Sequence, residues 1–539
     1  MSISHKRIAG NAGHLCLALV LLAGLLAGCL FSEPAPPADT SLGYTVIIVL
    51  DAARPDYFDL APMPNLRSLM AAGTYYDQAW VAQIVNNTPP GHASIATGLF
   101  PIHSGVPAFN WINPATRQVE APFTTQAVMA GEVNRLLEAA GARTLADWYK
   151  AAYPQAKAVA LSSYKSYAAA PMGGKSADVI AFSISQAGSA PANAQGEREA
   201  AEAAVADTTR QVPAGVKGQE PPPSILNDRR LVLKNPETPG AENGWAIDLA
   251  LALFKRYHPQ ITLINLPETD EKGHRTGADP DAIRPLMEKF DRDLGRLMAA
   301  YKAAGVYEKT VWVIISDHGM IPNTQAISQT LVEPLVPLND RNIALVNLPY
   351  IWLTDPARAP ALAGDLARLG LPNNIAIYAK SHDAAGAYRY QPAAAGALDP
   401  RLAAAYDYLL STCAFARGPD IVLLSRDYMP FGSRTKQSRG LHRDITWTTQ
   451  HIPLLIAGPG VRAGQISHAP ARLVDIAPTV MALLNVPHGA LDGVVLADAL
   501  LSPDATQAQA FDAMQNALAP LRDALRQRSV EDRAALGIP

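Results

Sequence analysis

Four short runs of apolar, largely β-branched residues recur along the chain and predict buried strands. They are residues 44–50, 261–266, 311–315 and 452–457. Such runs, separated by long helical stretches, are typical of a parallel sheet with helices on both faces. Residues 281–304 show the helical period and place one apolar face on Leu286, Phe290, Leu294 and Leu297. The pattern therefore predicts an α/β fold with a largely parallel central sheet sandwiched by helices.

Two long stretches of the chain break this pattern. Residues 188–244 are rich in Ala, Pro, Gly, Gln and Glu, which is typical of an irregular surface insertion. Residues 325–440 carry short strand and helix patterns of their own and predict an inserted subdomain. The remainder, residues 43–187, 245–324 and 441–539, forms one α/β domain that would carry the chemistry. We expect both insertions to lie over its active site.

The first 28 residues have the pattern of a signal peptide, with a basic start and an apolar run at 15–28. As a helix this run spans about 21 Å and falls short of the ~30 Å hydrocarbon core of a membrane. It ends in Leu-Ala-Gly-Cys29, which resembles a bacterial lipobox and implies lipidation of Cys29. Residues 29–42 then read as a tether. We expect an exported lipoprotein held by outer-membrane lipid at the periplasmic face; a cleaved signal or an uncleaved anchor is the alternative.

The charge balance argues against a nucleic-acid-binding protein, and the cysteine count argues against a disulfide-stabilised one. The 539 residues include 45 Lys and Arg and 48 Asp and Glu, a formal net charge of −3. Because there is no basic excess, we expect no nucleic-acid polymer as a partner. Two of the three cysteines, Cys16 and Cys29, lie in the leader region, and Cys413 alone lies in the body. The chain therefore has no internal disulfide framework, and Cys413 is interpreted as a buried thiol.

Acidic and histidine residues stand at the ends of the predicted strands, where ligands bind in open α/β sheets. Asp and His side chains occur there six times: Asp51, Asp270, His274, Asp317, His318 and His442. Mixed carboxylate and imidazole ligands suit zinc among the transition metals. Six ligands are too many for one tetrahedral ion. They are enough for two ions with open positions.

The segment NNTPPGHASIATG, residues 86–98, predicts a helix whose N-terminus can receive an anion. Thr88 is the expected N-cap, Pro89 fits the first helical position and Gly98 suits the helix end. Backbone N–H groups at such a start form a phosphate site. A neutral threonine is a weak nucleophile, so Thr88 needs a base or a metal to activate it.

In this order and spacing, the residues resemble the alkaline phosphatase superfamily, and within it the type I phosphodiesterase / nucleotide pyrophosphatase branch. The resemblance covers residues 44–110, 261–320 and 417–495. It implies a metal-dependent hydrolase of small phosphate esters in which Thr88 is the catalytic nucleophile and forms a phosphothreonine. Sulfatases share the fold but need a Cys or Ser before x-P-x-R, and here the segment is Thr-Pro-Pro-Gly-His.

The same resemblance implies how the metal ligands divide. One Zn²⁺, or Mn²⁺ or Fe in its place, would be held with the Thr88 oxygen by Asp51, Asp317 and His318. The other would be held by Asp270, His274 and His442. His442 is preferred to His451 because its distance to the strand at 452–457 matches the family. His92, inside the nucleophile segment, is not a family ligand, and we interpret it as structural.

Two substrate-binding positions depart from the family pattern. Asn110 is the candidate for the asparagine near the substrate phosphate, but it comes one residue late. Monoesterases of the group carry Lys-x-Arg, whereas here Lys165 is followed by Tyr167. A diester carries one charge less than a monoester and needs fewer cationic contacts. We therefore expect phosphodiester or nucleotide pyrophosphate substrates, with an alkaline-type phosphomonoesterase as the alternative and a non-catalytic anion-binding lipoprotein as the remote one.

Overall fold

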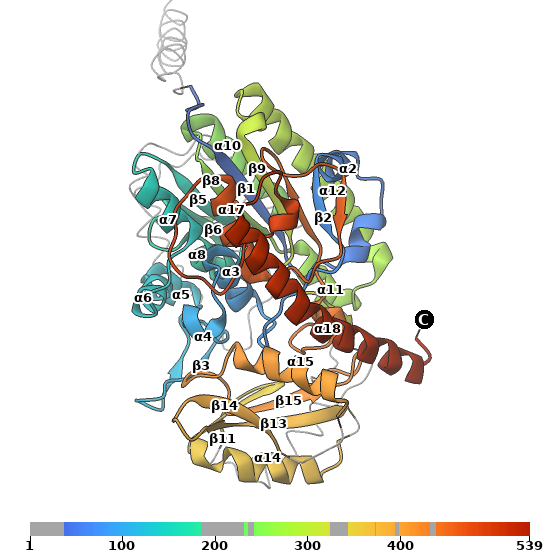
Figure 1. Ribbon diagram of the computed structural model, residues 1–539. Coiled ribbons are helices and arrows are strands. Elements are labelled where there is room, and N and C mark those ends of the chain that lie inside the picture. Colours follow the sequence, from blue (N-terminus) through green and yellow to red (C-terminus); the bar gives the residue numbers. More distant parts are fainter. Residues whose placement is uncertain are drawn as a thin grey trace, which may run out of the picture.

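A nine-stranded sheet forms the centre of the molecule (Figure 1). The computed structural model describes residues 37–184, 231–234, 242–323, 343–371, 373–393, 398–431 and 438–538. In spatial order the strands are β18 (Gln465–Ser467), β2 (Gly73–Tyr76), β17 (Leu454–Ala457), β9 (Thr310–Ile315), β1 (Tyr44–Leu50), β8 (Ile261–Leu266), β5 (Ala158–Ser162), β6 (Val179–Ile184) and β7 (Leu231–Lys234). The predicted strands at 44–50 and 261–266 are reproduced residue for residue, and the largely parallel α/β sheet is confirmed.

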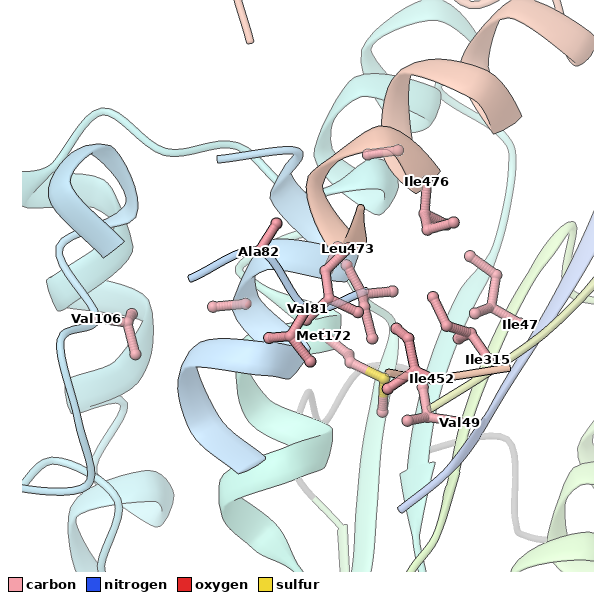
Figure 2. Close-up of a cluster of buried hydrophobic side chains, with 14 of the residues drawn as sticks. Ile47, Val49, Val81, Ala82, Val106, Met172, Ile315, Ile452, Leu473 and Ile476 are labelled. Atoms are coloured by element: carbon pink, nitrogen blue, oxygen red, sulfur yellow. The ribbon is translucent and has the colours of Figure 1, made fainter. Parts of the chain in front are cut away.

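The sheet is covered on both faces because its strands alternate between two apolar cores. Ile47 and Val49 of β1 face the core beneath a first layer of helices: α3 (Thr88–Thr97), α7 (Leu145–Ala152), α8 (Ser166–Gly173) and α17 (Ile476–Leu483). Figure 2 shows part of this core, where Ile47 and Val49 lie near Ile315. Val46 and Ile48 face the opposite core beneath a second layer: α2 (Pro64–Ala71), α10 (Glu242–Tyr257) and α12 (Pro280–Ala303).

Strand β17 runs antiparallel to its neighbours, with Leu454 opposite Ile315 and Ala457 opposite Trp312. The start of β17 therefore lies at the edge where β9 ends. This orientation explains why His442 comes before its strand in the sequence, whereas the other predicted ligands follow theirs. The segment that precedes β17 and the segments that follow β1, β8 and β9 therefore meet at the same edge of the sheet.

A second, antiparallel sheet lies within the predicted subdomain at 325–440, and we call it the cap sheet. Its order is β11 (Ile343–Asn347), β12 (Tyr350–Leu353), β15 (Ile421–Ser425), β13 (Asn374–His382) and β14 (Tyr388–Pro392). One face packs on α14 (Ala359–Arg368), and the other packs on α15 (Pro400–Ser411) in continuity with the first core. Cys413, buried as predicted, comes after Thr412, the residue that caps the end of α15. Figure 1 shows α18 (Ala505–Ala535) crossing the molecule beside α15.

Several predicted segments lie wholly or partly outside the described residues. These are the leader at 1–28, Cys29 with most of the tether at 29–42, and most of the insertion at 188–244. Of that insertion, residues 231–234 form the edge strand β7 and residues 242–244 begin α10. Among the described helices, none combines the length and apolarity that a membrane crossing requires.

Candidate active site

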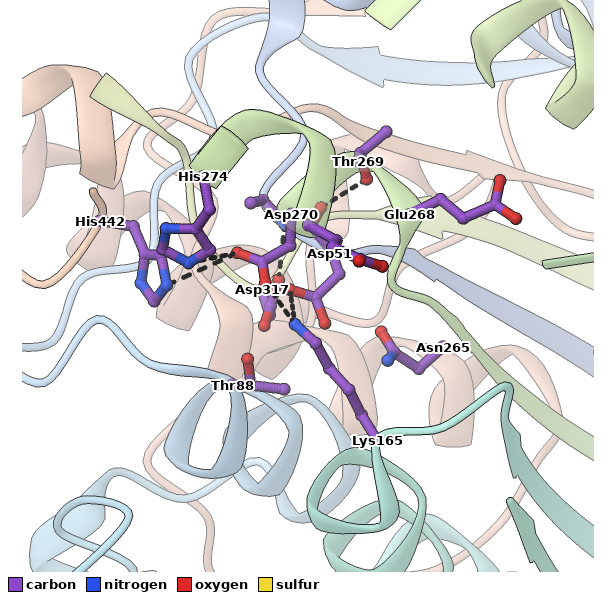
Figure 3. A network of polar contacts seen from close by, with 12 residues as sticks. Asp51, Thr88, Lys165, Asn265, Glu268, Thr269, Asp270, His274, Asp317 and His442 are labelled. Atoms are coloured by element: carbon purple, nitrogen blue, oxygen red, sulfur yellow. Dashed lines mark hydrogen bonds and ion pairs between the residues drawn. The ribbon is translucent and has the colours of Figure 1, made fainter. Parts of the chain in front are cut away.

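The site lies where β1, β8 and β9 end together. Leu50 pairs with Leu266, and Val49 pairs with Ile315, so the three carboxyl ends are level. Asp51 follows β1, and Asp317 and His318 follow β9. All three side chains are fully buried. Figure 3 shows these carboxylates converging with Asp270 and His442.

Asp270 and His274 lie on helix α11 (Glu268–Thr276), which the sequence pattern did not indicate. Three acidic residues in its first turn suit the positive end of the helix dipole, and Gly277 ends it in a left-handed conformation with φ 80°. The helix places residues i and i+4 on one face. As a result, His274 Nε2 lies 3.3 Å from Asp270 Oδ1.

The six predicted ligands come together, and the metal-capable side chains among them form two overlapping groups. One group consists of Asp51, Asp317 and His318, with all ligand atoms within 4.8 Å of one another. The second group of this kind consists of Asp270, His442 and again His318. His318 therefore stands between the two groups, stacked on the His442 ring at 3.8 Å. His274 flanks the second group through its contact with Asp270.

Backbone carbonyls orient the three imidazoles toward the site. His274 Nδ1 lies 2.7 Å from Gly440 O, and His318 Nδ1 lies 3.1 Å from Gly319 O. His442 Nδ1 lies 2.9 Å from Asn86 O. A carbonyl requires a proton on Nδ1, which leaves Nε2 of each ring as an acceptor for a metal. The donor set is therefore arranged as metal sites require.

Several oxygen and nitrogen atoms of this cluster are buried without a hydrogen-bond partner in the described chain. They include Oδ2 of Asp51, Oδ2 of Asp317 and Nε2 of His318. Such groups are costly to bury unless something pairs with them. Burial raises the pKa of Asp51 to about 6 and the pKa of Asp317 to about 7. Bound cations would relieve both costs, so the residues fit metal ions.

Thr88 sits at the first position of helix α3, one residue further into the helix than predicted. Asn87 is the N-cap, with extended backbone angles of φ −134° and ψ 156°, and the prolines follow at 89 and 90. Gly98 ends the helix in a left-handed conformation, as predicted. A Cβ on Gly91 would meet Asp317 Cβ at 3.0 Å. The start of α3 therefore packs directly against the metal-ligand segment.

His92 holds the nucleophile segment in place, in keeping with its structural interpretation. Its Nδ1 lies 2.8 Å from Thr88 O, and its Nε2 lies 3.0 Å from Asn265 Oδ1 at the end of β8. The ring is fully buried, and burial lowers the pKa of His92 to about 4. The His92 ring thus lies between α3 and the central sheet and contacts both.

Lys165 is buried at the centre of the cluster and is not a solvated surface residue. Its side chain is 3% exposed, and Nζ lies 2.9 Å from Asp51 Oδ1 and 2.6 Å from Asp270 Oδ2 (Figure 3). The ammonium group therefore spans the two ligand groups. Although burial alone raises the pKa of Asp270, Lys165 and His274 bring it well below its usual range.

The other predicted positions lie around this cluster. The Tyr167 ring packs edge-on against Phe109 at 4.7 Å, which places an aromatic pair beside Lys165. Asn110 Oδ1 accepts a 3.5 Å hydrogen bond from Asn347 of the cap sheet. His451, the rejected ligand candidate, stacks on Trp447 and contacts Asp77 O at 2.8 Å through Nε2.

Sequence reasoning missed the contacts that the cap sheet makes here. Asn347 accepts a hydrogen bond from the guanidinium of Arg443, and Tyr350 donates to the Arg443 carbonyl at 2.7 Å. Burial lowers the pKa of Arg443. Arg443 stands next to the ligand His442, which was the one available signal. Asn347 lies almost a hundred residues away in an insertion without a readable motif, so no local pattern could find it.

Comparison with known proteins agrees with this geometry. Residues 45–430 match the family described as type I phosphodiesterase / nucleotide pyrophosphatase. Alkaline phosphatase PhoD of Zymomonas mobilis is 24% identical over 483 residues, which cover 78% of this chain and 81% of that protein. The crystal structure of wild-type alkaline phosphatase PafA superimposes with a TM-score of 0.62 at 15% identity, covering 86% of this chain and all of the other.

A second solved structure supports the same fold. Murine ectonucleotide pyrophosphatase / phosphodiesterase 5, in complex with AMP, has a TM-score of 0.55 at 15% identity and covers 84% of this chain and 97% of its own. The family match spans well over half of the sequence. The chain belongs to the type I phosphodiesterase / nucleotide pyrophosphatase family, within the alkaline phosphatase superfamily, and is a hydrolase of phosphate esters.

Proposed function

We propose that this enzyme hydrolyses phosphodiesters or nucleotide pyrophosphates through a phosphothreonine intermediate on Thr88, at a site that holds two zinc ions. The observation that carries the proposal is the position of the α3 N-terminus: Gly91 packs against Asp317 and Asn86 O contacts the ligand His442, so Thr88 between them lies beside the cluster (Figure 3). Family membership argues against the remote alternative of a non-catalytic binding protein.

Asp51, Asp317 and His318 would hold one ion, and Asp270, His274 and His442 would hold the other. The position of His318 between the two groups supports a site in which the ions are close neighbours. Bound zinc would lower the pKa of an oxygen nucleophile and neutralise charge on the phosphoryl group. The same carboxylates and imidazoles also accept manganese or iron, so zinc follows from the mixed donor set and not from geometry.

The protein's own groups account for binding and orientation in the reaction. Thr88 Oγ1 attacks phosphorus, the alcohol or phosphate leaving group departs, and water then hydrolyses the threonine ester. The backbone N–H of Thr88 and the positive end of the α3 dipole would favour a negatively charged phosphate oxygen at the start of this helix, where Pro89 and Pro90 have no N–H of their own. Lys165 Nζ, held between Asp51 and Asp270, is placed to donate to a phosphate oxygen.

The side chains beside Lys165 favour diester substrates over monoesters. Tyr167 takes the position of the arginine that monoesterases of the group use, and its ring packs against Phe109 instead of offering a cation. The AMP complex of murine ectonucleotide pyrophosphatase / phosphodiesterase 5 supports a nucleotide as substrate. The resemblance to the alkaline phosphatases PhoD and PafA favours the second candidate, a phosphomonoesterase.

Steady-state hydrolysis by the zinc-loaded enzyme separates the two candidates. We expect kcat/KM for bis-p-nitrophenyl phosphate to exceed that for p-nitrophenyl phosphate by about tenfold or more, because one lost charge-assisted contact is worth roughly 1.5–3 kcal/mol. A clear preference for the monoester would mean that the remaining cations suffice for a dianion, and would replace the diesterase assignment by that of a phosphatase.

A further inference from the structure

Arg443 lies beside the metal-ligand cluster and is fixed there by the cap sheet. It follows His442, whose Nε2 lies 3.5 Å from Asp270 Oδ1. Asn347 and Tyr350 are paired across the β11–β12 hairpin. Asn347 contacts the Arg443 side chain, and Tyr350 contacts its carbonyl. One hairpin of the inserted subdomain therefore positions both the main chain and the guanidinium of this residue.

Among the described residues, Arg443 forms no ion pair with a carboxylate at contact distance. The neutral side chain of Asn347 accepts a hydrogen bond from the guanidinium. The guanidinium is part-buried and has further N–H groups that can donate to a ligand. The buried Arg472, in contrast, forms a two-point ion pair with Asp475, at 3.0 Å and 2.7 Å. Buried charges are normally paired in this way, whereas the Asp270 and Asp444 carboxylates act on the Arg443 guanidinium only from beyond ion-pair distance, which leaves it able to pair with an anionic ligand.

The segment Lys165-x-Tyr167 lacks the second cation that the Lys-x-Arg pair of the monoesterases provides. Lys165 spans Asp51 and Asp270, and the aromatic pair of Tyr167 and Phe109 fills the adjacent space without a charge. Arg443 supplies a second cation from a different segment. Asn347 fixes it and also donates to Asn110 at 3.5 Å, which draws Asn110 toward the cap.

We propose that Arg443, held by Asn347, binds a second anionic phosphate oxygen of the substrate and so determines which phosphate esters the enzyme prefers. The inference rests on the proposed hydrolytic function and adds a specificity residue to it. The oxygen has two sources: the attacked phosphoryl group of a monoester, or the neighbouring phosphate of a pyrophosphate. A simple diester such as bis-p-nitrophenyl phosphate offers neither and serves as the reference substrate.

The test compares Arg443→Gln with the unaltered metal-loaded enzyme on p-nitrophenyl phosphate, diadenosine diphosphate and the reference diester. We expect kcat/KM for at least one of the first two to fall about tenfold further than for the reference, as a lost charge-assisted hydrogen bond predicts. The monoester arm and the pyrophosphate arm identify the source of the anionic oxygen. An equal loss on all three substrates, or no loss on any, would overturn the proposal.

A second variant tests the charge while keeping the arginine and the shape of its partner. Asn347→Asp places a carboxylate on the guanidinium, so it should neutralise Arg443 and produce the same selective loss. Arg417→Gln is the matched control, because Arg417 belongs to the inserted subdomain and already faces Glu120 at 3.5 Å. Arg417→Gln should change kcat/KM for all three substrates by the same factor.

Calorimetric titration with inorganic phosphate and with pyrophosphate gives a readout that does not depend on turnover. Arg443→Gln should weaken the binding of at least one of them by about tenfold, and unchanged affinity for both would contradict the proposal. If the unaltered enzyme turned over none of the substrates, the proposed function would fail, while the titration would still decide the role of Arg443.

Discussion

Replacing Thr88 by alanine is expected to lower kcat by at least about a thousandfold, because the proposed phosphothreonine route then lacks its nucleophile. The side chain is buried at the start of α3, but alanine removes only its hydroxyl and one methyl group, so we expect the helix to keep its fold. Metal content should stay at the unaltered level, since six other side chains form the ligand cluster. Steady-state kinetics together with elemental analysis of the same sample would check both parts.

Thr97 at the other end of the same helix provides the control. Its hydroxyl donates to Ala93 O at 2.6 Å and has no role in the site. Thr97→Ala should cost about 1 kcal/mol of stability through that hydrogen bond and leave kcat near the unaltered value. If Thr88→Ala behaved like Thr97→Ala, another group would be the nucleophile.

Replacing His442 by alanine is expected to remove about one of two bound metal ions and to lower kcat by more than about a hundredfold, because even an outer-shell partner of a metal site is worth about 10- to 100-fold. The reason is geometric: His442 Nε2 and Asp270 Oδ1 are 3.5 Å apart, and Nδ1 is fixed on Asn86 O. Metal-to-protein ratios after dialysis against trace zinc would measure the loss.

His451 is the matched residue for this experiment, nine positions further along the chain. Its Nε2 already contacts the Asp77 carbonyl, and the ring stacks on Trp447. His451→Ala should therefore retain both ions. Loss of metal from the His451 variant and not from the His442 variant would reverse the choice between the two histidines.

The predictions that held depended on patterns within a few residues of one another. The buried runs of β1 and β8 predicted their strands, and the parallel register brings their ends level, so Asp51 and Asp270 had to approach each other. The end of α3 was predicted because Gly98 alone tolerates the left-handed turn there without strain.

The features that the sequence did not predict depend on contacts from outside the local pattern. Charged residues at 268–276 showed no apolar face, so α11 was not recognised as a helix; its acidic first turn and its glycine end stabilise it. The sharing of His318 between two ligand groups depends on its stacking with His442, more than a hundred residues away. The contact of Arg443 with Asn347 depends on how the inserted subdomain docks on the α/β domain.

The covalent role of Thr88 is the central claim, and trapping the intermediate tests it most directly. The zinc-loaded enzyme would be quenched in acid during turnover of bis-p-nitrophenyl phosphate, digested, and examined by peptide mass spectrometry. We predict a p-nitrophenylphosphoryl group on Thr88, in the peptide that contains residues 86–98. Turnover with the adduct on a different residue, or with no adduct under conditions where release of the intermediate limits the rate, would contradict the account.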